Sequence, residues 1–166
     1  MKTLISKIVV ILFFVCLSDG IQAQTPSPAL DQQKLMSQNL GIWHHNVSKD
    51  TVEVWEIERY GTAFEIKVYN LVKDKKVHIR KDFSSLNITD GKFYGVQHYY
   101  NGDMATWIGA FTSEKKMNVD FVKNFDPATV YAKYEFVNDS PDTFTMTGFT
   151  KDGVKTSEYK FTKVKK

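Results

Sequence analysis

Residues 53–68 read Glu-Val-Trp-Glu-Ile-Glu-Arg-Tyr-Gly-Thr-Ala-Phe-Glu-Ile-Lys-Val, and this stretch decides the predicted fold. Apolar and charged residues alternate on both sides of Tyr60-Gly61, a pattern typical of a β-hairpin that buries one face. A turn at this dipeptide pairs Trp55 with Ile66 on the apolar side, because side chains on a strand alternate between two faces. The segment therefore predicts two antiparallel strands with an apolar inner face and a mostly charged outer face.

The same period of two continues through residues 41–166. Turn signals such as Asn101-Gly102 and Asp152-Gly153 recur at intervals of roughly 10 to 15 residues. The second of these turns pairs Met146 with Tyr159, and it keeps the apolar face on one side of consecutive strands. We predict an all-β fold, an antiparallel up-and-down β-barrel of about 8–10 strands.

The N-terminal residues 1–23 have the pattern of a secretory signal peptide. Lys2 and Lys7 precede the apolar run 8–17, and the small residue Ala23 closes the segment. This run is much shorter than the roughly 20 residues that a membrane-spanning helix needs. We expect cleavage near Ala23 and a secreted or periplasmic protein that does not span a membrane.

Composition excludes several classes of function. The single cysteine of the chain, Cys16, lies inside the predicted signal peptide, so the mature protein has neither a disulfide nor thiol chemistry. The chain has 22 Lys and Arg against 19 Asp and Glu, a net charge of +3, which is too mild to indicate nucleic-acid binding. Aromatic residues make up 14% of the chain, which is ample for a packed core.

A short helix precedes the strands. Ser27-Pro28 fits a helix N-cap followed by proline at the first helical position, and Gly41 fits a C-cap. Between them, Met36 and Leu40 share one narrow stripe. We predict an amphipathic helix over about 28–40, so that the mature chain comprises a leader with a helix (24–40) and a barrel domain (41–166).

The segment Gly41-Ile42-Trp43 follows this helix and opens the strand series. A Gly-x-Trp in that place resembles the lipocalins and the broader calycin superfamily, and the chain looks most like the small secreted lipocalin-like domains of bacteria. The resemblance implies that Trp43 plugs one end of the barrel and that a basic side chain of the last strand lies across it. Lys163 has the inward parity for this role, and a cation over an indole contributes roughly 0.5–2 kcal/mol.

The inward-facing residues form a candidate ligand site. Its apolar members would line a pocket for a small lipid-like molecule, and the polar residues would orient the ligand. Arg59, beside a turn, is either a solvated charge at the strand end or a rim residue that holds an anionic head. In a filled barrel the same polar residues would instead be core residues with internal hydrogen bonds. The candidate residues are Trp55, Arg59, Phe64, Ile66, Gln97, Tyr99, Phe121 and Tyr134.

A two-residue turn at Asn101-Gly102 pairs Tyr99 with Met104. This register places Met104 and Ile108 inside the barrel, and it leaves an outward cluster. The cluster is either covered by the helix and by cross-strand pairing, or it is a surface for a protein partner. Its members are Tyr94, Val96, Trp107 and Phe111.

The histidines do not predict a metal or haem site. His44 and His45 are adjacent on a strand and therefore point to opposite faces, while His78 and His98 lie far apart across a hairpin. The chain lacks a nucleophile motif and a phosphate-binding glycine loop. Asn46-Val-Ser48 and Asn87-Ile-Thr89 match the N-glycosylation triplet, which matters only in a eukaryotic source.

Three functions follow from these patterns. The preferred one is a non-enzymatic binding protein for a small apolar ligand, without a cofactor. The alternative is a protein-interaction module of the cell envelope, for example an inhibitor, with a filled barrel and the outward cluster as its contact surface. The third, an enzyme acting on a small lipid or sugar, requires a carboxylate or histidine with a perturbed pKa in the pocket.

Overall fold

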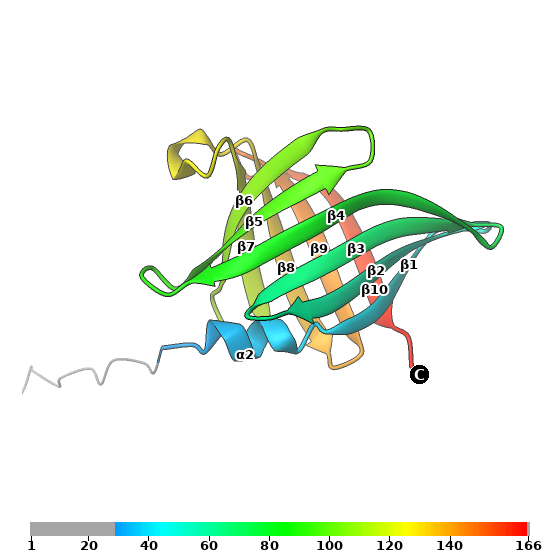
Figure 1. Cartoon of the computed structure of the whole chain (residues 1–166), viewed down its shortest axis with the longest axis horizontal. Coiled ribbons are helices and arrows are strands. Elements are labelled where there is room, and N and C mark those ends of the chain that lie inside the picture. Colours follow the sequence, from blue (N-terminus) through cyan, green and yellow to red (C-terminus); the bar gives the residue numbers. More distant parts are fainter. Residues whose placement is uncertain (1–28, 166) are drawn as a thin grey trace, which may run out of the picture.

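The structure is a computed structural model that describes residues 29–165; the predicted signal peptide and the first residues of the leader lie outside this range. Ten antiparallel strands form a closed barrel, preceded by one short helix, α2 (Figure 1). This confirms the predicted fold class. The strands are β1 (Gly41–Ser48), β2 (Thr51–Tyr60), β3 (Ala63–Val72), β4 (Lys75–Asn87), β5 (Lys92–Tyr99), β6 (Met104–Phe111), β7 (Lys116–Val122), β8 (Ala132–Ser140), β9 (Thr143–Thr150) and β10 (Lys155–Lys163).

Helix α2 (Gln32–Ser37) is shorter than the helix predicted over 28–40. It begins after Asp31, whose side chain accepts a hydrogen bond from the Lys34 amide at 2.9 Å. This capping carboxylate sets the start of the helix, and the proposed start at Ser27-Pro28 lies outside the described residues. Gly41 is not the C-cap either: it adopts a φ of +127° as the first residue of β1.

The helix closes one end of the barrel (Figure 1). Leu35 and Met36 are buried against a cluster from the barrel wall that includes Phe64, Trp107 and Phe111. This burial supplies the apolar partner that a two-turn helix needs, since so short a helix is unstable alone. The floor of the barrel interior is therefore made by α2.

The hairpin registers fall into three cases. The pairing of β9 with β10 places Met146 opposite Tyr159, as predicted. At the first hairpin, Trp55 pairs with Val68 instead of Ile66, which is a shift of two residues. A shift of two leaves every side chain on its predicted face, so Trp55, Ile66 and Phe64 are all buried on the inner side.

The hairpin between β5 and β6 corrects the prediction. The Tyr99 amide donates to the Asp103 carbonyl at 2.9 Å. The next residue pair of the ladder is His98 with Met104. The connection is thus a three-residue loop, in which Gly102 has a φ of +94°. The one-residue slip inverts the faces of β6. Met104 is 67% exposed, and Ile108 lies on the same outer face although it is buried, while the residues that alternate with them face inward.

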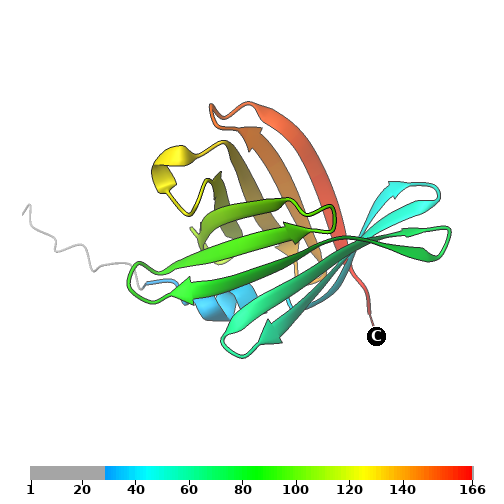
Figure 2. The same cartoon turned by 45° about the horizontal axis from the view of Figure 1, so that its top comes forward.

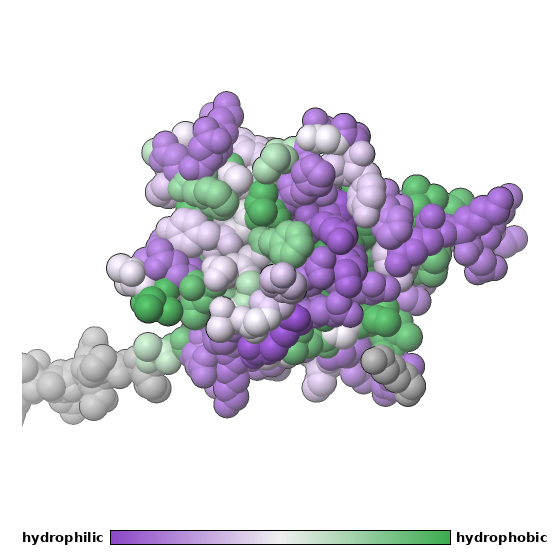
Figure 3. Space-filling model, in the orientation of Figure 1, coloured by the Kyte–Doolittle hydropathy of each residue, from purple (hydrophilic) through white to green (hydrophobic). Residues whose placement is uncertain are grey.

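A second feature is the sheet extension formed by two hairpins. The β1–β2 and β3–β4 hairpins project together beyond the rest of the barrel (Figure 2), and the Lys73 amide donates to the Asp50 carbonyl at 3.1 Å between their tips. The outer end of this extension is mostly hydrophilic (Figure 3). Within residues 29–165, no helix has the length and apolar character required to cross a membrane.

The barrel closes where β1 meets β10. Only two residue pairs join these strands, Trp43 with Lys163 and His44 with Thr162. Further along the seam the His45 ring takes the place of backbone pairing: its Nδ1 lies 3.1 Å from the Lys160 carbonyl oxygen. Among the strand pairs of the described chain this seam alone joins strands that are distant in sequence.

Candidate functional site

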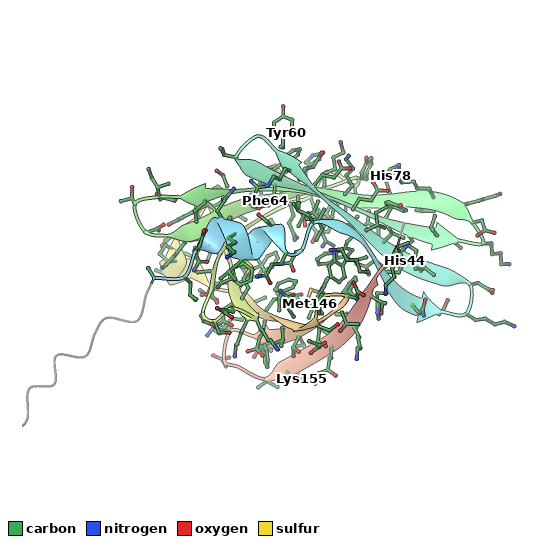
Figure 4. All side chains as sticks on the ribbon, turned by 90° about the horizontal axis from the view of Figure 1, so that it is seen from below. His44, Tyr60, Phe64, His78, Met146 and Lys155 are labelled. Atoms are coloured by element: carbon green, nitrogen blue, oxygen red, sulfur yellow. The ribbon has the colours of Figure 1, made fainter. Side chains whose placement is uncertain are left out.

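The barrel contains a cavity of about 390 Å³. It extends from Met36 of α2 at the floor to Tyr131, which is 46% exposed and follows the short helix η1 (Pro127–Thr129) at the opposite end of the barrel (Figure 1). Met146 of β9 lies inside the barrel, whereas Tyr60 at the β2–β3 turn points away from it (Figure 4). A cavity of this size falls within the range typical of small-molecule sites, roughly 300–1,000 Å³.

Apolar side chains make the lower part of the wall. Trp107 is central to it: its indole packs on Gly95 of the neighbouring strand, where a Cβ would overlap the ring. Gly95 therefore lets a large aromatic side chain lie flat against the sheet and leaves space in front of it. The other apolar lining residues of this part are Met36, Ile57, Ile66, Met117, Val119, Phe136 and Phe144.

A chain of polar side chains crosses the β4–β5 wall. The Arg80 Nε donates to both oxygens of Asp82, at 3.1 and 3.2 Å. The Gln97 Nε2 also donates to Asp82, at 3.1 Å, and the Gln97 Oε1 accepts from the Tyr99 hydroxyl at 2.9 Å. All four side chains line the cavity, so they provide hydrogen-bonding groups on a wall that is otherwise mostly apolar.

The chain is positioned by aromatic rings as well as by hydrogen bonds. The Arg80 guanidinium carbon lies 5.1 Å from the Trp55 ring centre and 5.9 Å from that of Tyr99. The Trp55 Nε1 in turn donates to Glu53 Oε1 at 2.6 Å. Arg80 is therefore held by a carboxylate at its Nε and by ring faces along its planar group, an arrangement that fixes the direction of its remaining donors.

Burial dominates the electrostatics of Asp82. Its side chain is almost completely enclosed, and this loss of solvation raises the pKa of Asp82 to about 6, although the charge of Arg80 and the hydrogen bonds from Arg80 and Gln97 act to lower it. Burial likewise raises the pKa of Tyr99 above its ordinary value. Asp82 therefore changes protonation near pH 6, well above the range of an exposed aspartate.

Most of the predicted ligand site does gather in this cavity. Six of the predicted residues line it: Trp55, Ile66, Gln97, Tyr99, Phe121 and Tyr134. The other two do not. Phe64 is fully buried in the cluster under α2, and Arg59 donates from its Nη2 to the Ser37 hydroxyl while lying 5.3 Å from the Phe64 ring centre. Arg59 therefore fastens the helix to the barrel instead of reaching the cavity.

The predicted outward cluster is wrong for two of its four members. Trp107 and Phe111 are 5% and 4% exposed and belong to the core under α2. Only Tyr94 and Val96 face outward, and the Tyr94 hydroxyl donates to Asp90 at 2.7 Å. The cause is the one-residue slip of β6, and a partner surface built on Tyr94, Trp107 and Phe111 does not exist.

The sequence reasoning missed Arg80 and Asp82. The inner face of β4 was not assigned from the sequence, so these two residues were not placed in the barrel. The signal that could have found them is parity: Asp82 lies opposite both Ile66 and Gln97, which were predicted to face inward. A strand placed between two correctly oriented neighbours must turn the same positions to the interior.

The floor end carries the Gly41–Trp43 segment. The Lys163 Nζ lies 5.0 Å from the Trp43 ring centre, and a Cβ at Gly41 would stand 2.8 Å from the Lys163 Cε. The Trp43 Nε1 donates to the Asn39 carbonyl at 2.8 Å. The glycine thus leaves room for the lysine stem that crosses the indole.

The histidines are dispersed. His45 packs between Tyr159 and Phe161, with both ring centres 5.3 Å away, and His78 stacks on Tyr100. Within the described range 29–165, no three His, Cys, Asp or Glu side chains group in a way that could hold a metal ion.

The candidate site is thus the cavity with its aromatic wall and the polar chain of β4 and β5. The chain matches no model of a known protein family, and no curated protein matches it significantly.

Proposed function

We propose that this protein is a non-enzymatic binding protein that holds one small, largely apolar molecule inside its barrel. The observation that carries the proposal is the cavity of about 390 Å³, whose walls combine aromatic and aliphatic side chains with a few convergent polar groups. This is the usual composition of small-molecule sites. Burial of ligand hydrocarbon would drive association, at roughly 25 cal/mol per Å² before the costs of association.

The proposal includes a likeness to lipocalins and a location outside the cytoplasm. The likeness is supported by the closed up-and-down barrel and by the Lys163 ammonium across Trp43. The location is supported by the signal-peptide pattern of residues 1–23.

The alternative, a protein-interaction module with a filled barrel, has lost its support. The barrel is not filled, and Trp107 and Phe111 of the cluster that was to form the contact surface lie in the core. Large apolar side chains are exposed elsewhere, among them Tyr60, Ile88 and Tyr100, but they stand at separate turns. Isolated apolar residues on a surface are normal and do not indicate a partner.

An enzyme would need a titratable group with a perturbed pKa in the pocket, and Asp82 meets that condition. Both oxygens of Asp82 already accept hydrogen bonds, from Arg80 and Gln97. These bonds use the carboxylate oxygens with which a general base would take a proton from a substrate. We therefore assign Asp82 to holding Arg80. The absence of enzymatic activity stays a prediction.

The test is a titration with N-phenyl-naphthylamine, a neutral apolar dye that becomes fluorescent in apolar surroundings. We expect saturable uptake of one dye per chain. Ala105→Trp, which adds an indole to the cavity wall, should weaken uptake at least roughly tenfold by filling the cavity. The matched control is Ala110→Trp on the outer face of the same strand, which should bind as the parent does. Equal binding by both variants, or no saturable uptake by the parent, would contradict a cavity site.

A further inference from the structure

The guanidinium of Arg80 is only partly used by the protein. Its side chain is 14% exposed and lines the cavity, yet its hydrogen bonds to Asp82 leave from Nε alone. Within residues 29–165, neither of its Nη groups has a hydrogen-bond partner. A guanidinium that is mostly buried and lines the cavity presents its free donors to whatever occupies the cavity.

The rest of the polar chain cannot take a second role. Asp82 accepts from Arg80 and Gln97, and the orientation of Gln97 is fixed by the Tyr99 hydroxyl at its Oε1. At Arg80 the open hydrogen-bonding capacity consists of donors, which select an acceptor on the ligand. A planar carboxylate is the acceptor that best matches the two Nη groups of an arginine.

From this geometry we propose that the ligand is an anionic amphiphile, whose carboxylate binds the free Nη groups of Arg80 and whose apolar, ring-containing body lies among the aromatic side chains of the cavity. This inference rests on the proposed binding function and names its ligand class. The ring-containing body is favoured because aromatic rings stack well on other aromatic rings. The aromatic side chains that line the cavity are Trp55, Tyr99, Trp107, Phe121, Tyr131, Tyr134, Phe136, Phe144 and Tyr159.

Two charged groups oppose an incoming anion, Asp82 beside Arg80 and Glu53 on the neighbouring wall. Asp82 has a pKa of about 6, and a second negative charge nearby raises the pKa of a carboxyl group further. Binding would therefore be accompanied by proton uptake at Asp82, after which the ligand replaces it as the counter-charge of Arg80. The remaining titratable side chains on the cavity wall are those of Tyr99, Tyr131, Tyr134 and Tyr159.

The experiment compares two probes that differ only in the head group, naphthylacetate and naphthylethanol, by isothermal titration of the purified protein. We expect the acid to bind at least roughly tenfold more tightly than the alcohol. This preference should grow as the pH is lowered from about 7.5 to about 5.5. Asp82→Asn should bind the acid more tightly at the higher pH and lose the pH dependence, because it carries no charge to be neutralised. Glu53→Gln is the control for the other carboxylate and should keep the pH dependence.

The decisive variant is the double substitution Arg80→Gln/Asp82→Asn, which removes the ion pair without leaving a buried charge unpaired. It should bind naphthylethanol as the parent does and lose the preference for the acid. If the double variant retains that preference, or if the parent binds acid and alcohol equally, the anion site is refuted while the cavity function stands. If the parent binds neither these probes nor the neutral dye, the proposed function itself is refuted.

Discussion

The Lys163 ammonium lies 5.0 Å from the centre of the Trp43 ring, and the two residues are also paired across the β1–β10 seam. Trp43 is 1% exposed, so the cation covers the outer face of an indole that is otherwise inside the protein. The contact thus joins the first strand to the last at the point where the barrel is closed.

Removing this cation should lower stability. Lys163→Met keeps the length of the side chain but loses the cation–π contact, and we expect the free energy of unfolding to fall by ~0.5–1 kcal/mol in urea denaturation. Lys160→Met, on the same strand with an exposed side chain, is the control and should change stability by less. Equal losses in the two variants would mean that the Trp43 contact contributes nothing of its own.

Asp82 should make the stability depend on pH in an unusual direction. Burial raises its pKa from 3.8 to about 6, so between these values the folded chain holds a proton that the unfolded chain releases. The contribution of Asp82 to stability is therefore present at low pH and is lost as the pH rises through about 6. Compared with Asp82→Asn, the parent should lose ~3 kcal/mol between about pH 3.5 and about pH 7.

The measurement is urea denaturation of both proteins at each pH, which cancels the other carboxyl groups in the difference. A difference between parent and Asp82→Asn that does not change with pH would show that Asp82 titrates normally.

The Gln32 side chain should control how firmly α2 closes the barrel. Its Nε2 donates to the Phe111 carbonyl at 3.0 Å and its Oε1 accepts from the Phe111 amide at 2.7 Å, so it completes the hydrogen bonding of the end of β6. Gln32→Ala should cost ~1–3 kcal/mol because both backbone groups lose their partner. Hydrogen exchange should quicken in α2 and at Phe111.

Gln33→Ala is the matched control for this variant. The Gln33 side chain donates one exposed hydrogen bond, to the Thr62 carbonyl, and its loss should have a smaller effect. If exchange in α2 quickens equally in both variants, the two-bond contact to Phe111 is not what holds the helix.

Gly95 should be required by the Trp107 indole. Gly95→Ala places a methyl group into the ring and should cost ~1–3 kcal/mol, with a changed near-ultraviolet circular dichroism signal from the displaced tryptophan. In a Trp107→Leu background the same substitution should cost far less, since the ring is gone. An unchanged cost in that background would place the strain in the backbone of β5 instead.

The strand pattern could be predicted from the sequence where charges mark the outer face. The Met146–Tyr159 pairing followed from alternation on both sides of Asp152-Gly153, and the first hairpin kept its faces despite a shift of two residues. At Asn101-Gly102 the sequence suits both two-residue and three-residue loops, and β6 has few charges to decide between them. The two-residue turn was assumed, and Trp107 and Phe111 were therefore predicted on the wrong face of β6.

The candidate site was predictable in its apolar part only. Aromatic residues on a face of known parity must lie inside, whereas Arg80 and Asp82 are residue types normally exposed, and their burial depends on meeting each other and Gln97 in space. Arg59 was predicted to contact a ligand, but its guanidinium donates to the Ser37 hydroxyl of α2. The alternation along the strands gives no information about this contact with the helix.

The narrow β1–β10 seam bears on how the chain reaches its closed form. Nine of the ten strand pairings in the described chain join neighbours in sequence and need only short excursions of the backbone, whereas the seam brings together Trp43 and Lys163 from opposite ends of the domain. Long-range contacts carry the larger loop-closure entropy and therefore form late. We therefore expect ring closure to be a late step of folding, and we expect the β1–β10 seam to be the first strand pairing that opens on unfolding.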